Sequence, residues 1–191
     1  MTTTQSQDEM LVRLNPEGEI IGSVSRKEAH NDESIIHAAV LVMIFTHPEM
    51  DETIEGKVGI EQLAGWFTQR SWDKDKYPGA YSVTAAGHVA YREGANLQEL
   101  LDETAHRETA EEVGLHGLDL ELIGTEIVHA PGEETQLIAV YRAITDALPY
   151  IADNEVAEIQ LENVNKMREL IDDREFTPFA LVAMRMLGVL S

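Results

Sequence analysis

The chain has 191 residues, of which 43% are hydrophobic, and this length suits one domain with a substantial core. Its 35 acidic and 14 basic residues give a net charge of −21, which repels nucleic-acid polymers but leaves room for a small phosphorylated ligand bridged by a divalent cation. The absence of cysteine excludes disulfides, zinc–thiolate sites and thiol nucleophiles, so any metal must be bound through oxygen or nitrogen.

The N-terminal residues carry no secretory signal, because no basic start is followed by an apolar run. No stretch approaches the roughly 20 apolar residues of a membrane span. We therefore expect a soluble, cytoplasmic protein that binds neither membranes nor nucleic-acid polymers. Residues 1–191 are expected to form a single domain, with residues 1–9 as a flexible tail.

The first half of the chain predicts strands separated by loops. Met10–Leu14 and Ile20–Ser25 flank a turn-forming segment at 15–18 and predict a β-hairpin. The unbroken apolar run at 38–45 predicts a central strand covered on both faces. The remaining segments predict a surface loop at 47–61, a strand at 63–69, a loop at 71–79, a short strand near 80–84 and then a glycine-containing loop.

The second half begins with a long predicted helix, Leu97–Val113, capped by Asn96 and ended by Gly114. The pattern that follows predicts strands at 122–129 and 135–144 around a turn, a last strand at 156–161, and helices at 164–171 and 178–190. This order predicts an α/β fold in which helices cover a mixed sheet. The apolar helix at 178–190 suits either the core or the interface of a homodimer.

The long helix carries an apolar stripe that continues into three acidic residues. The stripe comprises Leu97, Leu100, Leu101, Thr104 and Ala105. Glu108, Glu111 and Glu112 lie within about 60° of its centre, so we expect all three to point inward. Inward carboxylates repel one another unless a cation compensates them, and their spacing allows them to share Mg²⁺ or Mn²⁺. The alternative is a helix end that protrudes into solvent.

Residues 107–115, RETAEEVGL, resemble the second half of the signature of the Nudix hydrolase family. Gly87 and Glu93 match its first half, but the thirteen residues before Arg107 are six more than the family's spacing, so Glu99 competes with Glu93 for the first glutamate. The resemblance implies an α/β/α sandwich with a mixed β-sheet. It also implies that a divalent metal is bound by Glu108, Glu111, Glu112 and the carbonyl of Gly87, and that Arg107 orients the glutamates.

The implied reaction is attack of water on a phosphorus atom of a diphosphate. A metal neutralises the developing phosphate charge and lowers the pKa of a bound water. The proton acceptor is open between Glu112 or Glu108 on the helix and Glu133 or Glu134 in the predicted turn. Arg70 is the cation that we expect to contact the diphosphate.

Short segments at 15–22, 25–30, 69–70 and 78–79 resemble the Nudix branch related to isopentenyl-diphosphate isomerase. His30, His37 and His88 resemble the metal-binding positions of that branch, although we interpret them as hydrogen-bonded structural residues. The branch has a catalytic cysteine before Gly87, where this chain has Ala86. Isomerisation by that mechanism is therefore excluded.

The sequence thus predicts a Nudix-type hydrolase that uses Mg²⁺ or Mn²⁺ to cleave a diphosphate linkage in a small molecule, with a nucleoside diphosphate derivative as the expected substrate. A noncatalytic nucleotide-sensing module on the same fold is one alternative, because sites can be lost while a scaffold persists. An isomerase-like protein is the other. The sequence leaves the individual substrate and the oligomeric state open.

Overall fold

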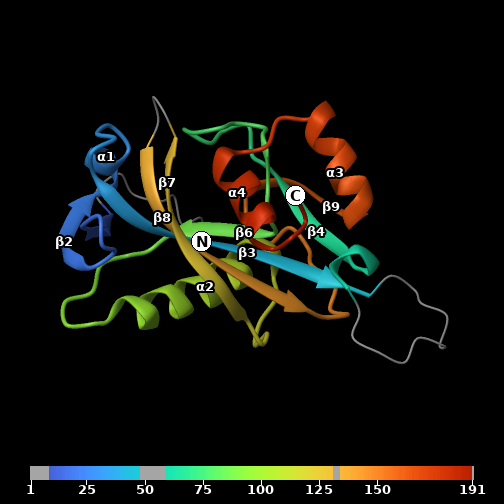
Figure 1. Cartoon of the computed structure of the whole chain (residues 1–191), viewed down its shortest axis with the longest axis horizontal. Coiled ribbons are helices and arrows are strands. Elements are labelled where there is room, and N and C mark those ends of the chain that lie inside the picture. Colours follow the sequence, from blue (N-terminus) through green and yellow to red (C-terminus); the bar gives the residue numbers. More distant parts are fainter. Residues whose placement is uncertain (1–8, 48–58, 131–133, 191) are drawn as a thin grey trace.

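The computed structural model describes residues 9–47, 59–130 and 134–190 (Figure 1). The elements in chain order are β1 Met10–Leu14, β2 Ile20–Ser25, α1 Arg26–Ala29, β3 Ile36–Thr46, the 3₁₀ helix η1 Ile60–Gln62, β4 Ala64–Arg70, β5 Tyr81–Ser82, β6 Ala85–His88, α2 Leu97–Val113, β7 Glu121–Ala130, β8 Glu134–Ile144, β9 Val156–Asn163, α3 Val164–Asp173 and α4 Pro178–Met186.

Strand β3 is the centre of a nine-stranded mixed sheet. It runs parallel to β8, from the pair Ile36 and Thr135 to the pair Phe45 and Ile144, and antiparallel to β1, β4 and β6. Every residue of β3 from His37 to Phe45 is buried. The apolar run at 38–45 therefore forms the central strand that the sequence predicts, because both of its faces are covered.

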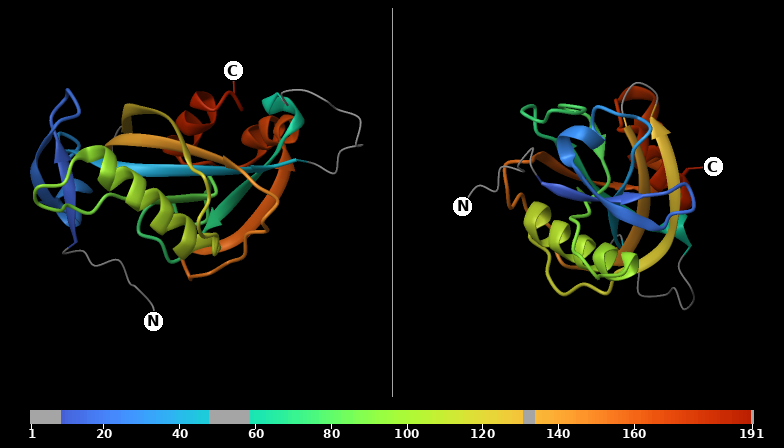
Figure 2. Two further views of the ribbon diagram at one scale, coloured as in Figure 1. Left: turned by 90° about the horizontal axis from the view of Figure 1, so that it is seen from below. Right: turned by 90° about the vertical axis from the view of Figure 1, so that its left-hand side faces the viewer.

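The two faces of the sheet are covered by different helices. Val40, Val42 and Ile44 pack on one face with the apolar stripe of α2. Leu41 and Met43 point the other way, into a cluster that contains residues of α3 and α4. Figure 1 shows α2 on one side of β3 and the two C-terminal helices on the other, and Figure 2 shows the same layers from two further directions. The fold is the predicted α/β/α sandwich.

Helix α2 has the predicted bounds and the predicted caps. The side chain of Asn96 accepts a hydrogen bond from the backbone N–H of Glu99, and Gly114 has a φ of 68°. The left-handed conformation favours glycine because it has no Cβ to clash with the backbone. Both ends of this helix are therefore determined by residues next to them in the sequence.

Two short elements differ from the sequence-based expectation. The predicted glycine-containing loop after residue 84 begins with a strand, β6, that pairs with β3. Its Ala-Ala-Gly-His sequence has little strand propensity, so pairing with the core strand decides its conformation. Helix α1 follows β2 directly, where Ser25 and Glu28 form a capping box.

The structure describes only part of the N-terminal segment and of the turn between β7 and β8. Of the expected tail at 1–9, only Glu9 is described, and its carbonyl accepts a hydrogen bond from Arg26 at 2.8 Å. Residues 131–133 of the predicted turn, including Glu133, lie outside the described residues. Helix α4 buries Phe179, Ala180 and Met184 in the core of its own chain. Within the described ranges, no helix is long and apolar enough to cross a membrane.

Candidate functional site

The predicted metal-binding end of α2 lies against strand β6. Glu108 and Glu112 are 2% and 6% exposed. The Glu112 Oε2 atom accepts a hydrogen bond of 3.1 Å from the backbone N–H of Ala86. A Cβ atom on residue 87 would lie only 2.0 Å from Glu108 Oε1. Gly87 therefore permits the close approach that buries both carboxylates beside β6.

The third glutamate of this helix does not point inward. The Glu111 side chain is 48% exposed and accepts a hydrogen bond of 2.8 Å from Arg107 Nη1. The other terminal nitrogen of Arg107 lies 2.6 Å from Glu108 Oε1, in an ion pair without hydrogen-bond alignment. Strand β6 meets the helix at Glu108 and Glu112, which leaves Glu111 at the edge in solvent. The expectation of three inward glutamates is therefore wrong for Glu111.

Burial makes the two inward carboxylates hard to ionise. It raises the pKa of Glu108 to about 7, against the opposing charge of Arg107. Burial first, and the neighbouring charge of Glu108 second, raise the pKa of Glu112 well above its usual range. A divalent cation held by oxygen ligands would relieve both effects, because it supplies positive charge where solvent is excluded. The residues present therefore fit a hard divalent ion.

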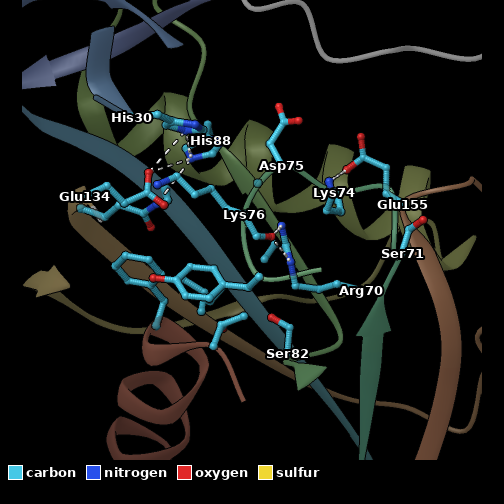
Figure 3. Close-up of a pocket in the computed structure, with 18 of the residues that line it drawn as sticks. His30, Arg70, Ser71, Lys74, Asp75, Lys76, Ser82, His88, Glu134 and Glu155 are labelled. Carbon is cyan, nitrogen blue, oxygen red and sulfur yellow. Dashed lines mark hydrogen bonds and ion pairs between the residues drawn. The ribbon is translucent and has the colours of Figure 1, made fainter. Parts of the chain in front are cut away.

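A second group of ligand atoms gathers at the C-terminal end of β6, and we call it the histidine–glutamate cluster. It comprises His30, His37, His88 and Glu134, whose ligand atoms all lie within 4.8 Å of one another. Glu134 Oε2 lies 3.3 Å from the Nε2 atoms of both His30 and His37, and 4.0 Å from that of His88. Figure 3 shows Glu134 facing His30 and His88 across one end of the cavity.

The cluster contains buried polar atoms that lack hydrogen bonds. His37 is fully buried, and neither of its ring nitrogens has a hydrogen-bond partner among the described residues. The same holds for Glu134 Oε2. Buried groups of this kind are costly and rare, and a shared metal ion would satisfy them together. His37 is therefore a candidate metal ligand, and its 3.3 Å contact with Glu134 also leaves the interpretation of a structural residue in place.

The electrostatics of the cluster also suit a metal. Burial lowers the pKa of His30 to about 4, and burial likewise lowers the pKa of His88 well below its usual range. Both imidazoles are therefore neutral at pH 7, which is the form that binds metals. Three imidazole nitrogens and one carboxylate favour a transition ion such as Mn²⁺ over Mg²⁺.

A cavity of about 310 Å³ is lined by His30, His88 and Glu134 of the histidine–glutamate cluster, whereas the glutamates of α2 lie behind strand β6 and are not among its lining residues. Ala86, Gly87 and His88 of β6 form part of its wall. Four of the chain's 14 basic side chains line it, namely Arg26, Arg70, Lys74 and Lys76. The acidic side chains of Asp73, Asp75, Glu134 and Glu155 line it as well, so the cavity offers both cations that can contact phosphate oxygens and carboxylates that can contact a metal ion.

Arg70, the predicted substrate contact, is fixed in the cavity wall by its own backbone neighbours. Its Nε and Nη2 atoms donate hydrogen bonds to the carbonyl of Lys76 at 3.2 and 3.0 Å. These bonds close the loop 71–79 onto the end of β4 and bring Lys74 and Lys76 to the same cavity (Figure 3). In the sequence, Lys74 and Lys76 are recognisable only as charged residues of one loop. Arg26 lines the same cavity and is the first residue of α1, directly after its cap Ser25.

Other sequence candidates lie elsewhere or take another role. Glu99 is in the first turn of α2, paired with Arg92 at 2.5 Å, and Glu93 is exposed in the preceding loop. Neither lines the cavity. Glu134, a candidate proton acceptor in a predicted turn, is instead the buried first residue of β8. Gln136 lies two residues further along β8, on the same face of the strand, and it lines the same cavity. This spacing of two polar residues is a local sequence signal that Glu134 faces the cavity.

Comparisons with known proteins agree with this architecture. The NUDIX domain matches residues 60–180, more than half of the chain. The isopentenyl-diphosphate Delta-isomerase of Saccharopolyspora erythraea is 29% identical over 159 residues, which cover 78% of this chain and 69% of that protein. The protein of the same name from Kocuria rhizophila is 24% identical and covers 92% of this chain and 87% of its own length.

Solved structures share the fold at lower identity. DR0079 from Deinococcus radiodurans superposes with a TM-score of 0.69 at 18% identity, covering 93% of this chain and 99% of that chain. The NUDIX domain of Shewanella oneidensis NrtR, complexed with ADP ribose, has a TM-score of 0.57 at 15% identity, covering 79% and 85%. The domain match, together with the layered fold around α2, establishes that this chain belongs to the NUDIX family.

Proposed function

We propose that this protein is a metal-dependent hydrolase that cleaves a diphosphate linkage in a small molecule, with nucleoside diphosphate derivatives as the substrate class. The observation that carries the proposal is one cavity that combines four basic side chains with a wall, β6, that contacts both groups of metal ligands. Basic side chains recognise phosphate oxygens, and hard cations bridge those oxygens to carboxylates.

The proposed metal ligands are the inward Glu108 and Glu112 of α2, the carbonyl of Gly87 in β6, and Glu111 from the exposed edge of the helix end. A divalent cation bound there supplies charge neutralisation and a more acidic water. Arg107 contacts Glu108 and Glu111 and is assigned the role of positioning them. The histidine–glutamate cluster is a second candidate centre, suited to Mn²⁺.

The remaining steps fall to the protein's own side chains. Arg70 holds the diphosphate at the cavity wall, where its charge offsets that of the phosphate oxygens. Glu108 or Glu112 accepts the proton of the attacking water.

The substrate class has support from one structural neighbour. The NUDIX domain of NrtR was solved with ADP ribose, which is a nucleoside diphosphate derivative. That neighbour indicates only that the fold accommodates such a molecule. Aromatic side chains in the cavity, Tyr77 and Phe179, offer apolar surface for the part of the ligand beyond the phosphates.

Isomerisation of a prenyl diphosphate is the second candidate function. Two relatives carry the name isopentenyl-diphosphate Delta-isomerase, and the histidine–glutamate cluster contains the three histidines that resemble that branch. Against it, Ala86 lines the cavity without any group that exchanges protons. A noncatalytic binding module is the third alternative, suggested by the extended spacing before Arg107.

One screen for catalytic turnover distinguishes the three functions. Purified protein is incubated with Mg²⁺ or Mn²⁺ and with nucleotide sugars, dinucleotides, nucleoside triphosphates or isopentenyl diphosphate, and the products are resolved by chromatography with mass detection. Hydrolysis of a diphosphate that falls in Arg70→Met and persists in the exposed control Arg185→Met supports the proposal. A shifted double bond supports the isomerase. Ligand binding by calorimetry without turnover supports the binding module.

A further inference from the structure

Gln136 lies beside the histidine–glutamate cluster without being one of its four members. In β8 it is paired in register with His37 of β3. Glu134 precedes it by two residues, so both side chains lie on the same face of the strand. Gln136 is 5% exposed and lines the cavity together with His30, His88 and Glu134. A neutral amide is therefore held at the boundary between the cluster and the cavity.

The amide of Gln136 contacts the cluster at an atom that a metal would use. Its Nε2 atom lies 3.4 Å from His88 Nε2. An amide nitrogen only donates, so His88 Nε2 accepts and the imidazole proton lies on Nδ1. The same His88 Nε2 atom faces the rest of the cluster, at 3.3 Å from His30 Nε2 and 4.0 Å from Glu134 Oε2. The lone pair that accepts from Gln136 is therefore the one that would bind a metal.

Metal binding at the cluster would deprive Gln136 of this acceptor. The Nε2 atom of a neutral imidazole has one lone pair, which cannot accept a hydrogen bond and hold a metal at the same time. The N–H group of Gln136 would then lose its partner at a position that is only 5% exposed. A buried donor without an acceptor is costly, so the metal-bound protein favours a new acceptor for this group.

The neighbouring part of the cavity favours an anionic oxygen as that acceptor. Arg26 begins α1, His30 follows the last residue of this helix, and both line the cavity with Gln136. A guanidinium group and an amide N–H both donate hydrogen bonds, so a ligand that meets both must supply oxygen lone pairs. Phosphate oxygens do so, and their charge suits a guanidinium group and a metal ion alike.

We propose that Gln136 contacts the diphosphate of the ligand and couples its binding to that of the metal. In the metal-free protein the amide donates to His88. When a metal takes the Nε2 atom of His88, the same N–H group donates to a phosphate oxygen instead. Gln136 is thus a residue that contacts the ligand and is not itself a metal ligand. This inference rests on the proposed function, because it assigns Gln136 to the binding of the same diphosphate.

Manganese binding tests whether Gln136 competes with the metal for His88. Mn²⁺ is titrated calorimetrically into protein saturated with Mg²⁺, which prefers oxygen ligands and leaves the nitrogen-rich cluster to Mn²⁺. Gln136→Met removes the competing amide, so it should bind Mn²⁺ at least as tightly as Gln98→Met, the matched control at the exposed start of α2. Weaker Mn²⁺ binding in Gln136→Met would make Gln136 a support of the metal site and would overturn the inference.

Pyrophosphate binding tests the contact with the ligand. Inorganic pyrophosphate is titrated into each variant in excess Mn²⁺ and, separately, into the metal-free protein. With Mn²⁺, Gln136→Met should bind pyrophosphate about tenfold more weakly than Gln98→Met does, because a hydrogen bond to a charged oxygen is lost. Without metal the two variants should bind it equally, since the amide then donates to His88. A loss of the same size with and without Mn²⁺ would contradict the exchange of partners.

A second variant keeps the test decisive if Gln136→Met does not fold. Gln136→Asn keeps a polar amide but withdraws it by one methylene group, so it should also bind pyrophosphate more weakly in the presence of Mn²⁺. Unchanged pyrophosphate affinity in a folded variant would overturn the inference, because the displaced N–H group would then donate to Glu134 or to water. Failure of the unmodified protein to hydrolyse any diphosphate rejects the proposed function, whereas these affinities still test the role of Gln136.

Discussion

Glu112 is buried, at 6% exposure, and its carboxylate has a single described hydrogen bond, from the backbone N–H of Ala86. Burial and the charge of Glu108 both raise its pKa, so its ionised form is unfavourable in the absence of a cation. The apolar first half of α2 packs independently of it, through residues such as Leu100 and Leu101. Function and folding should therefore respond differently when this one carboxylate is neutralised.

Glu112→Gln is expected to abolish turnover without weakening the fold. Glutamine keeps an oxygen that can accept from Ala86 and removes the repulsion with Glu108, so the metal-free melting temperature should stay the same or rise. Activity should fall by about 100-fold or more, as expected for loss of a group that acts in proton transfer or metal binding. Glu103→Gln, on the exposed side of the same helix, is the matched control. Unfolding of the metal-free variant would make Glu112 a structural residue.

The pH dependence of stability is predicted to depend on Glu108. Burial raises its pKa in the folded protein from an ordinary 4.5 to about 7, so its contribution to stability is present below pH 4.5 and is lost as the pH rises through 7. Glu108→Gln does not titrate. In EDTA, the variant should gain up to about 3 kcal/mol over the unmodified protein between these pH values.

Thermal or urea unfolding of both proteins across this pH range measures the difference. His30 contributes in the opposite direction, since burial lowers its pKa to about 4 and stability falls as the pH drops from 6.5 towards that value. That contribution is common to both proteins and cancels in the comparison. A stability difference that does not change with pH would contradict the role assigned to burial at Glu108.

At the scale of elements, the contact between β6 and α2 brings the two groups of ligands together. Strand β6 ends in His88 of the histidine–glutamate cluster, and its residues Ala86 and Gly87 contact the inward glutamates of the helix. The opposite edge of the strand pairs with β3, which also supplies His37. A displacement of β6 would therefore alter both candidate centres at once.

Gly87→Ala is expected to separate β6 from α2. The added Cβ would lie 2.0 Å from Glu108 Oε1, and the carboxyl carbon at 2.1 Å leaves the side chain little freedom to turn away. We expect a loss of about 1–3 kcal/mol of stability, as in overpacked cores, together with a large loss of turnover. Gly124→Ala in β7 is the control, because its Cβ would meet only Met186 Cε at 3.5 Å. Equal stability of the two variants would show that β6 and α2 can shift without cost.

At the scale of the whole molecule, a strongly acidic chain has a cavity lined by four basic and four acidic side chains, and we propose that an anionic ligand binds there. The net charge of −21 opposes binding of an anion from solution, and the cavity cations offset this only locally. A divalent ion adds positive charge at the same place. Metal and substrate should therefore bind in a mutually dependent way, with each raising the affinity of the other.

Removal of metal should abolish turnover and lower the melting temperature. EDTA-treated protein is predicted to be inactive, and Mn²⁺ at about 100 times its dissociation constant should restore roughly 2.7 kcal/mol of stability. For a chain of this size, that corresponds to a rise of roughly 5–10 °C. His37→Leu should show a smaller Mn²⁺-induced rise, since it removes one ligand of the cluster. Full activity after EDTA treatment would reject metal dependence.

Features that depend on neighbouring residues could be predicted from the sequence. The bounds of α2 follow from its cap Asn96, its apolar stripe and Gly114, and the burial of β3 follows from its continuous apolar run. The inward positions of Glu108 and Glu112 follow from helical periodicity in the same way. At these positions, capping hydrogen bonds and the buried face of each element depend on residues only a few positions away in the chain. A sequence pattern carries information over that range.

Tertiary structure alone decided which of the remaining residues meet. Periodicity assigns Glu111 the same inward angle as Glu108, yet β6 covers only one side of the helix end, and Glu111 pairs with Arg107 in solvent. The candidate ligands His30, His37, His88 and Glu134 come from four separate segments, and the pairing of β3 with β6 and β8 brings the last three of them together. Strands from distant segments pair because the whole sheet buries apolar surface. The residues next to a single histidine therefore do not predict which strands will pair.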